Sequence, residues 1–322
     1  MNLRLIRVKN VENQHVSMAD VDDFESSVID LSNVSICYES LYLKKFVRPF
    51  VAKVINRLSP KFQSPVFCIS MGATGVSRSF PYMFFSTGNI LYLFDAWPGT
   101  YDTILKIVKA YNINVLFITS KESTANLQAL LPDIDVKWCP EGCRTEKYKV
   151  YDYSLKDIDV LQLGRKYDLW HDKVVDKLQA SGISYLYERI KGKPIFKSRE
   201  DFIDGLGRSK ISVCFPKSLT HHKQAGGITT MTNRYLQSLA SKCLILGTTP
   251  DEMKEVFGYD PVIPVDMRDP AEQIVEILKN FNDYVPLIEK NYNECLSNHT
   301  WHNRWLKILE ILQNIKTWNR EG

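Results

Sequence analysis

Short apolar segments alternate with helical segments along most of this chain, and this alternation is the feature that most restricts its fold. Between residues 64 and 140, strand-like apolar segments lie at 64–70, 89–97, 114–120 and 135–140. Between them lie segments with apolar residues at helical spacing, at 101–112 and 123–131. An alternation of this period is typical of a parallel sheet with helical crossovers, so the pattern predicts an α/β fold.

The same pattern is repeated after a polar connector at residues 141–157. Strands are predicted at 158–164, 184–190, 210–216 and 242–247, and helices at 168–182, 199–209 and 233–241. The length of 322 residues suits two domains of ordinary size. We therefore expect two Rossmann-like domains that face each other across a cleft, over residues 1–150 and 151–322. In the first domain, the segment 41–58 also has a helical pattern.

The composition excludes several classes of protein. Hydrophobic residues make up 44% of the chain and charged residues 24%, as in globular proteins. The net charge of +4, without a block of like charges, suits an anionic small ligand or a weak contact with a membrane surface. It does not suit nucleic-acid binding, for which a concentrated basic face is typical.

The cysteines and the apolar runs indicate where the protein is found. Seven cysteines are scattered along the chain, several within apolar runs, which predicts buried thiols in a reducing compartment. The first residues, MNLRLIRVKNVENQ, lack the apolar core of a signal peptide, and no run approaches the ~18 apolar residues of a membrane span. We expect a cytoplasmic protein with no metal site.

The stretch QAGGITTMTNRY, which leads into the helix predicted at 233–241, has the residues of an anion site. Gly226 and Gly227 permit close approach of the backbone to a ligand, and Thr232 or Asn233 can cap the helix. The free amides at a helix start favour an anion, and Arg234 can add a bidentate contact to phosphate oxygens. The alternative is a plain glycine loop with Arg234 in solvent.

A second strand end supplies further cations. Gly164 and Arg165 follow the strand predicted at 158–164, and Lys173 lies on the next helix. Ligands of open α/β sheets bind at the carboxyl ends of the strands, where these residues and Arg234 are expected to meet. Together they predict a site for a nucleoside diphosphate.

Three stretches of the second half resemble a known family. They are DVLQLGRKYDLWHDKVVDKL, TTMTNRYLQSLASKCLIL and NHTWHNRWLKILEIL, within residues 157–315. They are similar to the C-terminal domain of group 1 glycosyltransferases with the GT-B architecture, in the branch of spore-maturation and surface-polysaccharide enzymes. The N-terminal half is similar to the acceptor-side domain in outline, and it ends in WCPEG, like the family's W-x-P-x-G.

The resemblance implies roles for particular residues. Arg165, Lys173, Thr232, Asn233 and Arg234 would face the donor diphosphate. Gln237 stands where the family usually has a glutamate that binds the ribose. A glutamine can hydrogen-bond hydroxyls but carries no charge. Lys242 stands where the family usually has a glycine. These two departures leave a non-catalytic relative open as an alternative.

Other candidates come from loops at predicted strand ends. Asp95 is a candidate base for an inverting transfer, and a turn-capping aspartate is the alternative. Gly72, Gly75 and Arg78 are candidates for the sugar or acceptor side, although glycine turns after strands are common. His221 and His222 can contact the diphosphate or the sugar, or can lie at the surface.

The residues and the resemblance together predict a glycosyltransferase. It would move a sugar from a nucleotide diphosphate sugar to a hydroxyl of a glycan or lipid-linked glycan, in bacterial synthesis of surface polysaccharides such as capsule or lipopolysaccharide. We expect no cofactor and no metal, because Arg165, Lys173 and Arg234 can neutralise the diphosphate. A peripheral contact with the inner membrane face is also expected. The alternatives are a non-catalytic nucleotide-sugar-binding or scaffold subunit, and a nucleotide-sugar epimerase.

Overall fold

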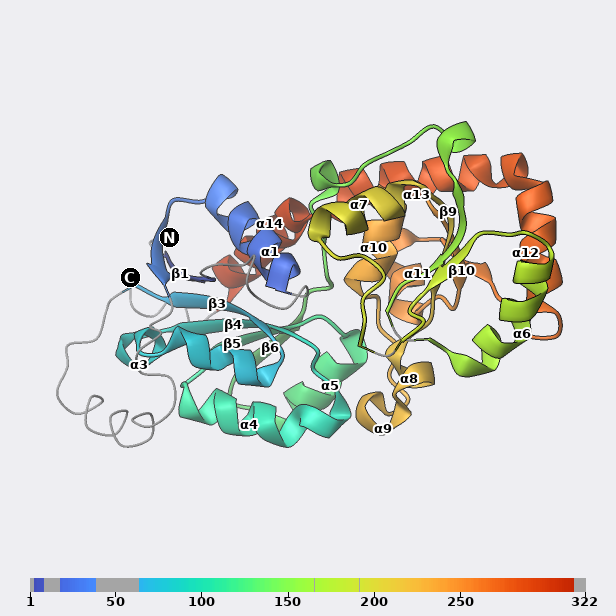
Figure 1. The fold of residues 1–322 in the computed structure, drawn as a ribbon. Helices are drawn as coiled ribbons and strands as arrows, with labels where there is room; N and C mark the ends of the chain where they lie inside the picture. The colour runs from blue at the N-terminus through green and yellow to red at the C-terminus, as the bar shows by residue number, and fades with distance from the viewer. Residues whose placement is uncertain (1–2, 9–17, 39–63, 165, 191, 316–322) are drawn as a thin grey trace. The chain divides into compact units, whose positions relative to one another are not determined.

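A computed structural model describes residues 3–8, 18–38, 64–164, 166–190 and 192–315 (Figure 1). Its contacts divide the chain into two compact units. Unit 1 comprises Met1–Pro140 and Trp301–Gly322, and unit 2 comprises Glu141–Thr300. The helix predicted at 41–58 lies outside the described residues.

Within the described residues, unit 1 has a parallel sheet of six strands in the order β2-β1-β3-β4-β5-β6. The strands are β1 (Leu3–Arg7), β2 (Val34–Tyr38), β3 (Val66–Met71), β4 (Asn89–Phe94), β5 (Val115–Ile118) and β6 (Asp135–Trp138). Its α-helices are α1 (Met18–Leu31), α3 (Tyr82–Phe85), α4 (Tyr101–Ala110), α5 (Lys121–Leu130) and α14 (Trp301–Asn314).

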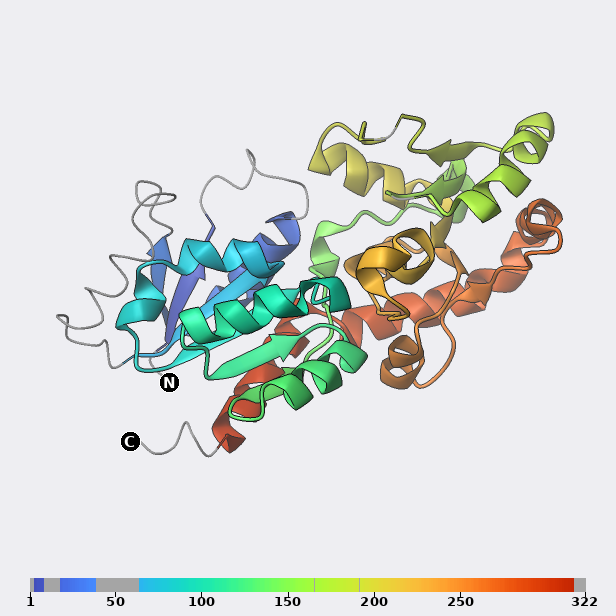
Figure 2. The same cartoon turned by 90° about the horizontal axis from the view of Figure 1, so that it is seen from below.

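Helices cover both faces of this sheet, as a parallel sheet requires. Residues of α1 and α14 pack in one apolar cluster with β1, β3, β4 and β5, and residues of α4 and α5 pack in the cluster on the other face. Figures 1 and 2 show these two layers. The strands of the sheet interior are mostly apolar because both of their faces are buried; every residue of β4 is buried, and Asn89 is its one polar residue.

The last described helix belongs to unit 1 although it follows unit 2 in the sequence. On α14, Trp301 stacks on Phe24 with ring centroids 4.4 Å apart, and Trp305 stacks on Phe67. The indole N–H of Trp305 donates to the Ser32 hydroxyl at 2.7 Å. The division therefore differs from the predicted one at residue 150: the chain passes to unit 2 after Pro140 and returns at Trp301.

Unit 2 has a parallel sheet with five strands among the described residues, in the order β11-β10-β9-β7-β8. The strands are β7 (Ile158–Gln162), β8 (Tyr185–Tyr187), β9 (Ser209–Cys214), β10 (Leu244–Gly247) and β11 (Ile263–Pro264). The α-helices are α6 (Asp168–Ala180), α7 (Arg199–Gly207), α8 (Lys217–Thr220), α9 (His222–Ala225), α10 (Asn233–Ala240), α11 (Asp251–Phe257), α12 (Pro270–Lys279) and α13 (Val285–Asn298).

The helices of unit 2 also form two layers (Figure 1). Residues of α6 and α12 pack on one face of the sheet, and residues of α7, α10 and α11 pack on the other. Along the chain, β8 is added on one side of β7 and β9 on its other side, so the chain order reverses between β7 and β9. Such a switch point is where open α/β sheets bind their ligands.

The predicted fold class is confirmed: both units are α/β with parallel sheets. The predicted burial of all seven cysteines is also confirmed, and all seven are free thiols. The strands β1, β2 and β11 were not predicted. Among the described residues, no helix combines the length and the apolar character needed to cross a membrane.

Candidate functional site

The switch point of unit 2 brings two of the predicted site residues into contact. Gly164 follows β7 with φ +68°, a backbone conformation that favours glycine. A Cβ atom at Gly164 would lie 2.8 Å from Nη2 of Arg234, near the start of α10. The absence of a side chain at Gly164 therefore makes room for the Arg234 guanidinium. The guanidinium lies between the end of β7 and the start of α10.

The guanidinium of Arg234 carries a charge that the protein does not balance within the described residues. There, it makes no hydrogen bond and no ion pair, although the side chain is half-buried. Removing a cation from water without a partner is costly, so buried or half-buried arginines are normally paired. A half-buried, unpaired arginine at a switch point has the properties of an anion-binding group.

The first turn of α10 adds polar groups beside Arg234. Thr232 is the N-cap residue, and its side chain makes no capping hydrogen bond. Asn233 is only 6% exposed, yet neither Oδ1 nor Nδ2 has a hydrogen-bond partner among the described residues. The backbone N–H of Asn233 donates to Oε2 of Glu141 at 2.6 Å. Glu141 lies within the WCPEG stretch but was not predicted as a site residue from the sequence.

The loop before α10 is held by a second buried carboxylate. Glu252, on α11, accepts hydrogen bonds from the Thr230 hydroxyl and from the Met231 N–H, the latter at 2.7 Å. Gly226 has φ +58°, which explains the need for glycine there. A Cβ at Gly227 would meet no atom within 4 Å, so its surroundings leave room for a side chain.

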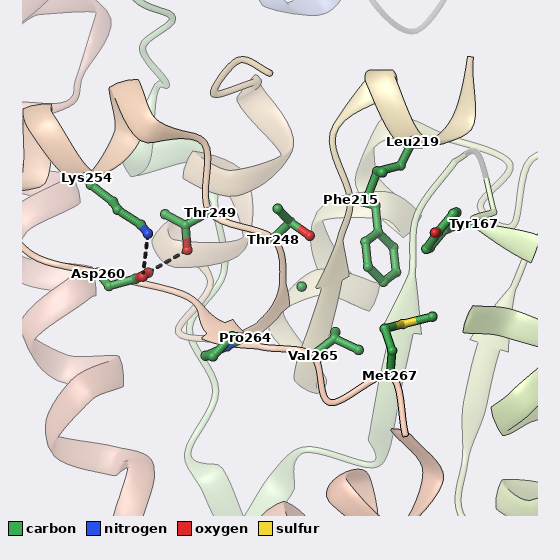
Figure 3. Close-up of a pocket in the computed structure, with 11 residues that line it drawn as sticks. Tyr167, Phe215, Leu219, Thr248, Thr249, Lys254, Asp260, Pro264, Val265 and Met267 are labelled. Atoms are coloured by element: carbon green, nitrogen blue, oxygen red, sulfur yellow. Dashed lines mark hydrogen bonds and ion pairs between the residues drawn. The ribbon is translucent and has the colours of Figure 1, made fainter. Parts of the chain in front are cut away.

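A pocket with a cavity of about 310 Å³ lies at the carboxyl ends of β9, β10 and β11 (Figure 3). At one end lie Thr249, Lys254 and Asp260, and the Asp260 carboxylate accepts a hydrogen bond from Thr249 and pairs with Lys254. The other end is lined by apolar and aromatic side chains; they are Tyr167, Phe215, Leu219 and Met267. Its two unlike ends suit a ligand with an aromatic ring and polar substituents.

Two contacts connect this pocket to the rest of unit 2. The hydroxyl of Tyr235, on α10, donates to the backbone carbonyl of Thr248 in the pocket at 2.7 Å. Lys173 does not meet Arg234 in the described structure; it is exposed, and its Nζ donates to the backbone carbonyl of Met267 at 2.6 Å. Lys173 therefore holds the loop that carries one wall of the pocket.

The remaining predicted residues of unit 2 have different positions. Arg165 lies outside the described residues. Gln237 lies half-buried on α10, and His221 and His222 are exposed where α8 meets α9. The pocket residues Phe215 and Thr248 were not predicted from the sequence. Each directly follows a strand, β9 and β10, so the rule that ligands bind at strand ends could have identified them.

Lys242 explains one departure from the family pattern. It has φ +52°, so the backbone keeps the left-handed conformation that a glycine would take. Its Nζ contacts both carboxylate oxygens of Glu289 at 2.7 Å and lies 4.7 Å from the ring centroid of Tyr292. These contacts give Lys242 a structural role between α10 and α13.

The candidates of unit 1 are placed as follows. Asp95 is exposed with φ +54°, and its Oδ1 accepts the indole N–H of Trp97 at 2.8 Å. Gly72 has φ +71°, and a Cβ at Gly75 would lie 2.6 Å from the Ser70 hydroxyl oxygen. Arg78 is buried, 7% exposed.

Arg78 has a partner inside unit 1. Its Nη2 lies 2.7 Å from Oε1 of Glu25, which is fully buried, and Glu25 also accepts the Val8 N–H at 2.9 Å. Burial raises the pKa of Glu25 to about 7, although Arg78 and the Val8 N–H act in the opposite direction. Arg78 forms a buried ion pair with Glu25, so we do not include Arg78 in the proposed site.

No protein-family description matches the sequence, and neither does any curated protein. Solved structures do match: HepE of Anabaena in complex with UDP and glucose has a TM-score of 0.60 at 7% identity, covering 98% of this chain and 100% of HepE.

Two further solved structures are similar over nearly their whole length. Sucrose-phosphate synthase of Thermosynechococcus elongatus has a TM-score of 0.62 at 9% identity, covering 97% of this chain and 98% of that one. The UDP-forming trehalose-phosphate synthase of Burkholderia vietnamiensis has a TM-score of 0.57 at 9% identity, covering 97% and 100%. Likeness over nearly the full length confirms the predicted GT-B fold: this chain has the same two-unit α/β fold as these three proteins.

Proposed function

We propose that this protein is a glycosyltransferase that takes a sugar from a nucleoside diphosphate sugar and transfers it to a hydroxyl of a glycan or lipid-linked glycan. The observation that carries the proposal is the guanidinium of Arg234. It is half-buried at the switch point of unit 2, lies against Gly164, and has no anionic partner within the described residues. A diphosphate would supply the missing negative charge.

The pocket of Figure 3 is proposed to hold the nucleoside. Its aromatic end, with Tyr167 and Phe215, suits a base, and its polar end, with Thr249 and Asp260, suits hydroxyl groups. The Tyr235–Thr248 hydrogen bond links the pocket to α10, on which Arg234 lies. The complexes of HepE with UDP and with UDP-glucose support a nucleotide of this type.

In the proposed reaction, the acceptor hydroxyl attacks the anomeric carbon, the bond to the diphosphate breaks, and the nucleoside diphosphate leaves. Arg234 and the dipole of α10 stabilise the charge that develops on the leaving group. Arg165, Lys173, Gly226, Gly227, Thr232, Asn233 and Gln237 remain proposed donor-site residues. We expect activity without an added divalent metal, because Arg165, Lys173 and Arg234 are proposed to supply the positive charge that neutralises the diphosphate.

Other residues are proposed for the acceptor side of the reaction. Asp95 is the proposed base if the transfer inverts the anomeric centre, since it lies exposed after β4. Gly72, Gly75, His221 and His222 are retained as proposed contacts of the sugar or the acceptor. A role in bacterial surface polysaccharide synthesis, at the cytoplasmic face of the membrane, rests on the sequence resemblance and on the net charge of +4.

A second candidate is a subunit that binds a nucleotide sugar without turning it over. Gln237 favours it, because an uncharged amide stands where the family usually has a ribose-binding glutamate. Lys242 does not favour it, because its contacts with Glu289 and Tyr292 are structural.

A nucleotide panel tests the donor site. UDP, GDP, CMP, dTDP and NAD are added to the wild type and to Arg234→Ala, and the unfolding temperature is recorded. A nucleoside diphosphate at ~100 times its Kd adds about 2.7 kcal/mol to stability, which raises the midpoint by several degrees. We expect this shift with a nucleoside diphosphate and its loss in Arg234→Ala.

The matched control is Arg268→Ala, because Arg268 is an exposed arginine of unit 2 that pairs with Asp266. It should keep the full shift. If no nucleotide stabilises the wild type, or if Arg234→Ala responds as the wild type does, the donor site is not where we place it.

A further inference from the structure

A carboxylate of the protein itself occupies the start of α10. Glu141 is 8% exposed, and its Oε2 accepts the N–H of Asn233, the first residue of α10, at 2.6 Å. Free amides at a helix start bind carboxylates and phosphates by the same interaction. Glu141 therefore takes a donor that a phosphate oxygen would otherwise use.

The neighbouring side chains nevertheless have the properties of a ligand site. Oδ1 and Nδ2 of Asn233 are buried without a partner in the described structure, and such unsatisfied groups are destabilising. The next residue is Arg234, whose guanidinium has no partner among the described residues. The first turn of α10 thus carries a cation and a buried amide that lack partners among the described residues, beside an anion of the protein.

The charge of Glu141 affects different nucleotides differently. In a nucleoside diphosphate, the terminal phosphate carries about one more negative charge than the same phosphate esterified to a sugar. A carboxylate at the start of α10 repels the free diphosphate more strongly than the sugar ester, because Coulomb repulsion scales with charge.

We propose that Glu141 is a specificity-determining residue that makes this site favour the sugar-bearing donor over the nucleoside diphosphate that leaves after transfer. The inference rests on the proposed function, since it assumes that the diphosphate binds at α10. Glu141 weakens the binding of both ligands and weakens that of the product more. Product release is thereby favoured, and product inhibition is limited.

The variant that tests this is Glu141→Gln, which removes the charge but keeps an oxygen that can accept the Asn233 N–H. Dissociation constants are measured by calorimetry for each ligand of two pairs, UDP and UDP-glucose, and GDP and GDP-mannose. We expect Glu141→Gln to lower the dissociation constant of the nucleoside diphosphate about tenfold and that of its sugar ester about threefold. The ratio of the two constants then changes in favour of the product.

Glu252→Gln is the matched control, because Glu252 is also a buried carboxylate that holds the loop before α10, through Thr230 and Met231. Glu252→Gln should not lower the dissociation constant of either ligand. The unfolding temperature of the ligand-free proteins separates a structural role: if Glu141 only held the loop, Glu141→Gln would lower stability and affinity together.

The outcomes separate this inference from the proposed function. Suppose that the wild type binds a nucleoside diphosphate and Arg234→Ala does not. If Glu141→Gln then binds each ligand with the wild-type affinity or more weakly, the proposed role of Glu141 is wrong and the donor site stands. If no pair of ligands binds the wild type or Glu141→Gln, both the inference and the donor site are wrong.

Discussion

At the scale of single residues, the contact between Gly164 and Arg234 is central to the proposed donor site. Gly164→Ala places a methyl group 2.8 Å from the present position of Nη2 of Arg234, in a backbone conformation that alanine rarely adopts. We expect a loss of about 1–2 kcal/mol of stability from the strained backbone and at least a tenfold loss of nucleotide affinity. Urea denaturation and calorimetric titration measure the two effects.

Gly182→Ala is the matched control for this variant. Gly182 also lies in unit 2 and has φ +69°, but a Cβ there would meet no atom within 4 Å. It should lose a similar amount of stability and keep the wild-type affinity. An equal loss of affinity in both variants would mean that the contact with Arg234 does not shape the site.

The sequence predicted part of this site because glycine and arginine have chemical preferences that are visible without a structure. Gly164 and Arg234 were both expected at strand ends of one sheet, and the structure places them in contact. Glu141 was missed because its partner, Asn233, is 92 positions away, and no spacing pattern reveals such a pair. Arg78 was a candidate ligand contact because it lies in a glycine-bearing loop after a strand; its buried partner, Glu25, is 53 positions away and could not be inferred from the sequence.

At the scale of elements, α14 stabilises unit 1 although it is far from that unit in the sequence. Trp305 is fully buried against Phe67 and donates to Ser32. We expect Trp305→Ala to cost about 3–5 kcal/mol in the unfolding free energy of unit 1, through the cavity it leaves. Leu306→Ala, at the next position with 55% of the side chain exposed, should cost less than about 1 kcal/mol.

Chemical denaturation followed by tryptophan fluorescence and by hydrogen exchange distinguishes the two units in this test. The loss should be confined to amides of unit 1. A similar loss in Leu306→Ala, or a loss confined to amides of unit 2, would contradict the packing of α14 described above.

The elements were predictable where hydrophobic periodicity is strong. The strands β3–β5, β7, β9 and β10 are apolar runs between helical segments, and each formed as expected. The strand β2 was missed because it lies at the sheet edge, with only Cys37 buried among its five residues. The strand β11 is only two residues long, Ile263–Pro264, which is too short to show a period.

At the scale of the whole molecule, the sequence predicted two α/β units but not their boundaries. The polar connector at 141–157 suggested a single crossing at residue 150, whereas the chain crosses after Pro140 and again before Trp301. A C-terminal helix that returns to the first unit is apolar on one side whichever sheet it covers. Its pattern therefore cannot show which unit it joins, and only packing against Phe24 and Phe67 decides.

The most direct test of the proposed transferase is release of the nucleoside diphosphate from a nucleotide sugar. Each of UDP-glucose and GDP-mannose is incubated with the wild type, Arg234→Ala and Arg268→Ala, without an acceptor. We predict slow hydrolysis of one donor by the wild type and by Arg268→Ala, because water replaces the acceptor hydroxyl. In Arg234→Ala the rate should fall about 100-fold, as expected when a group that stabilises the leaving charge is removed. Two results would contradict the proposed function: tight binding of a nucleotide sugar with no turnover, or hydrolysis by Arg234→Ala at the wild-type rate.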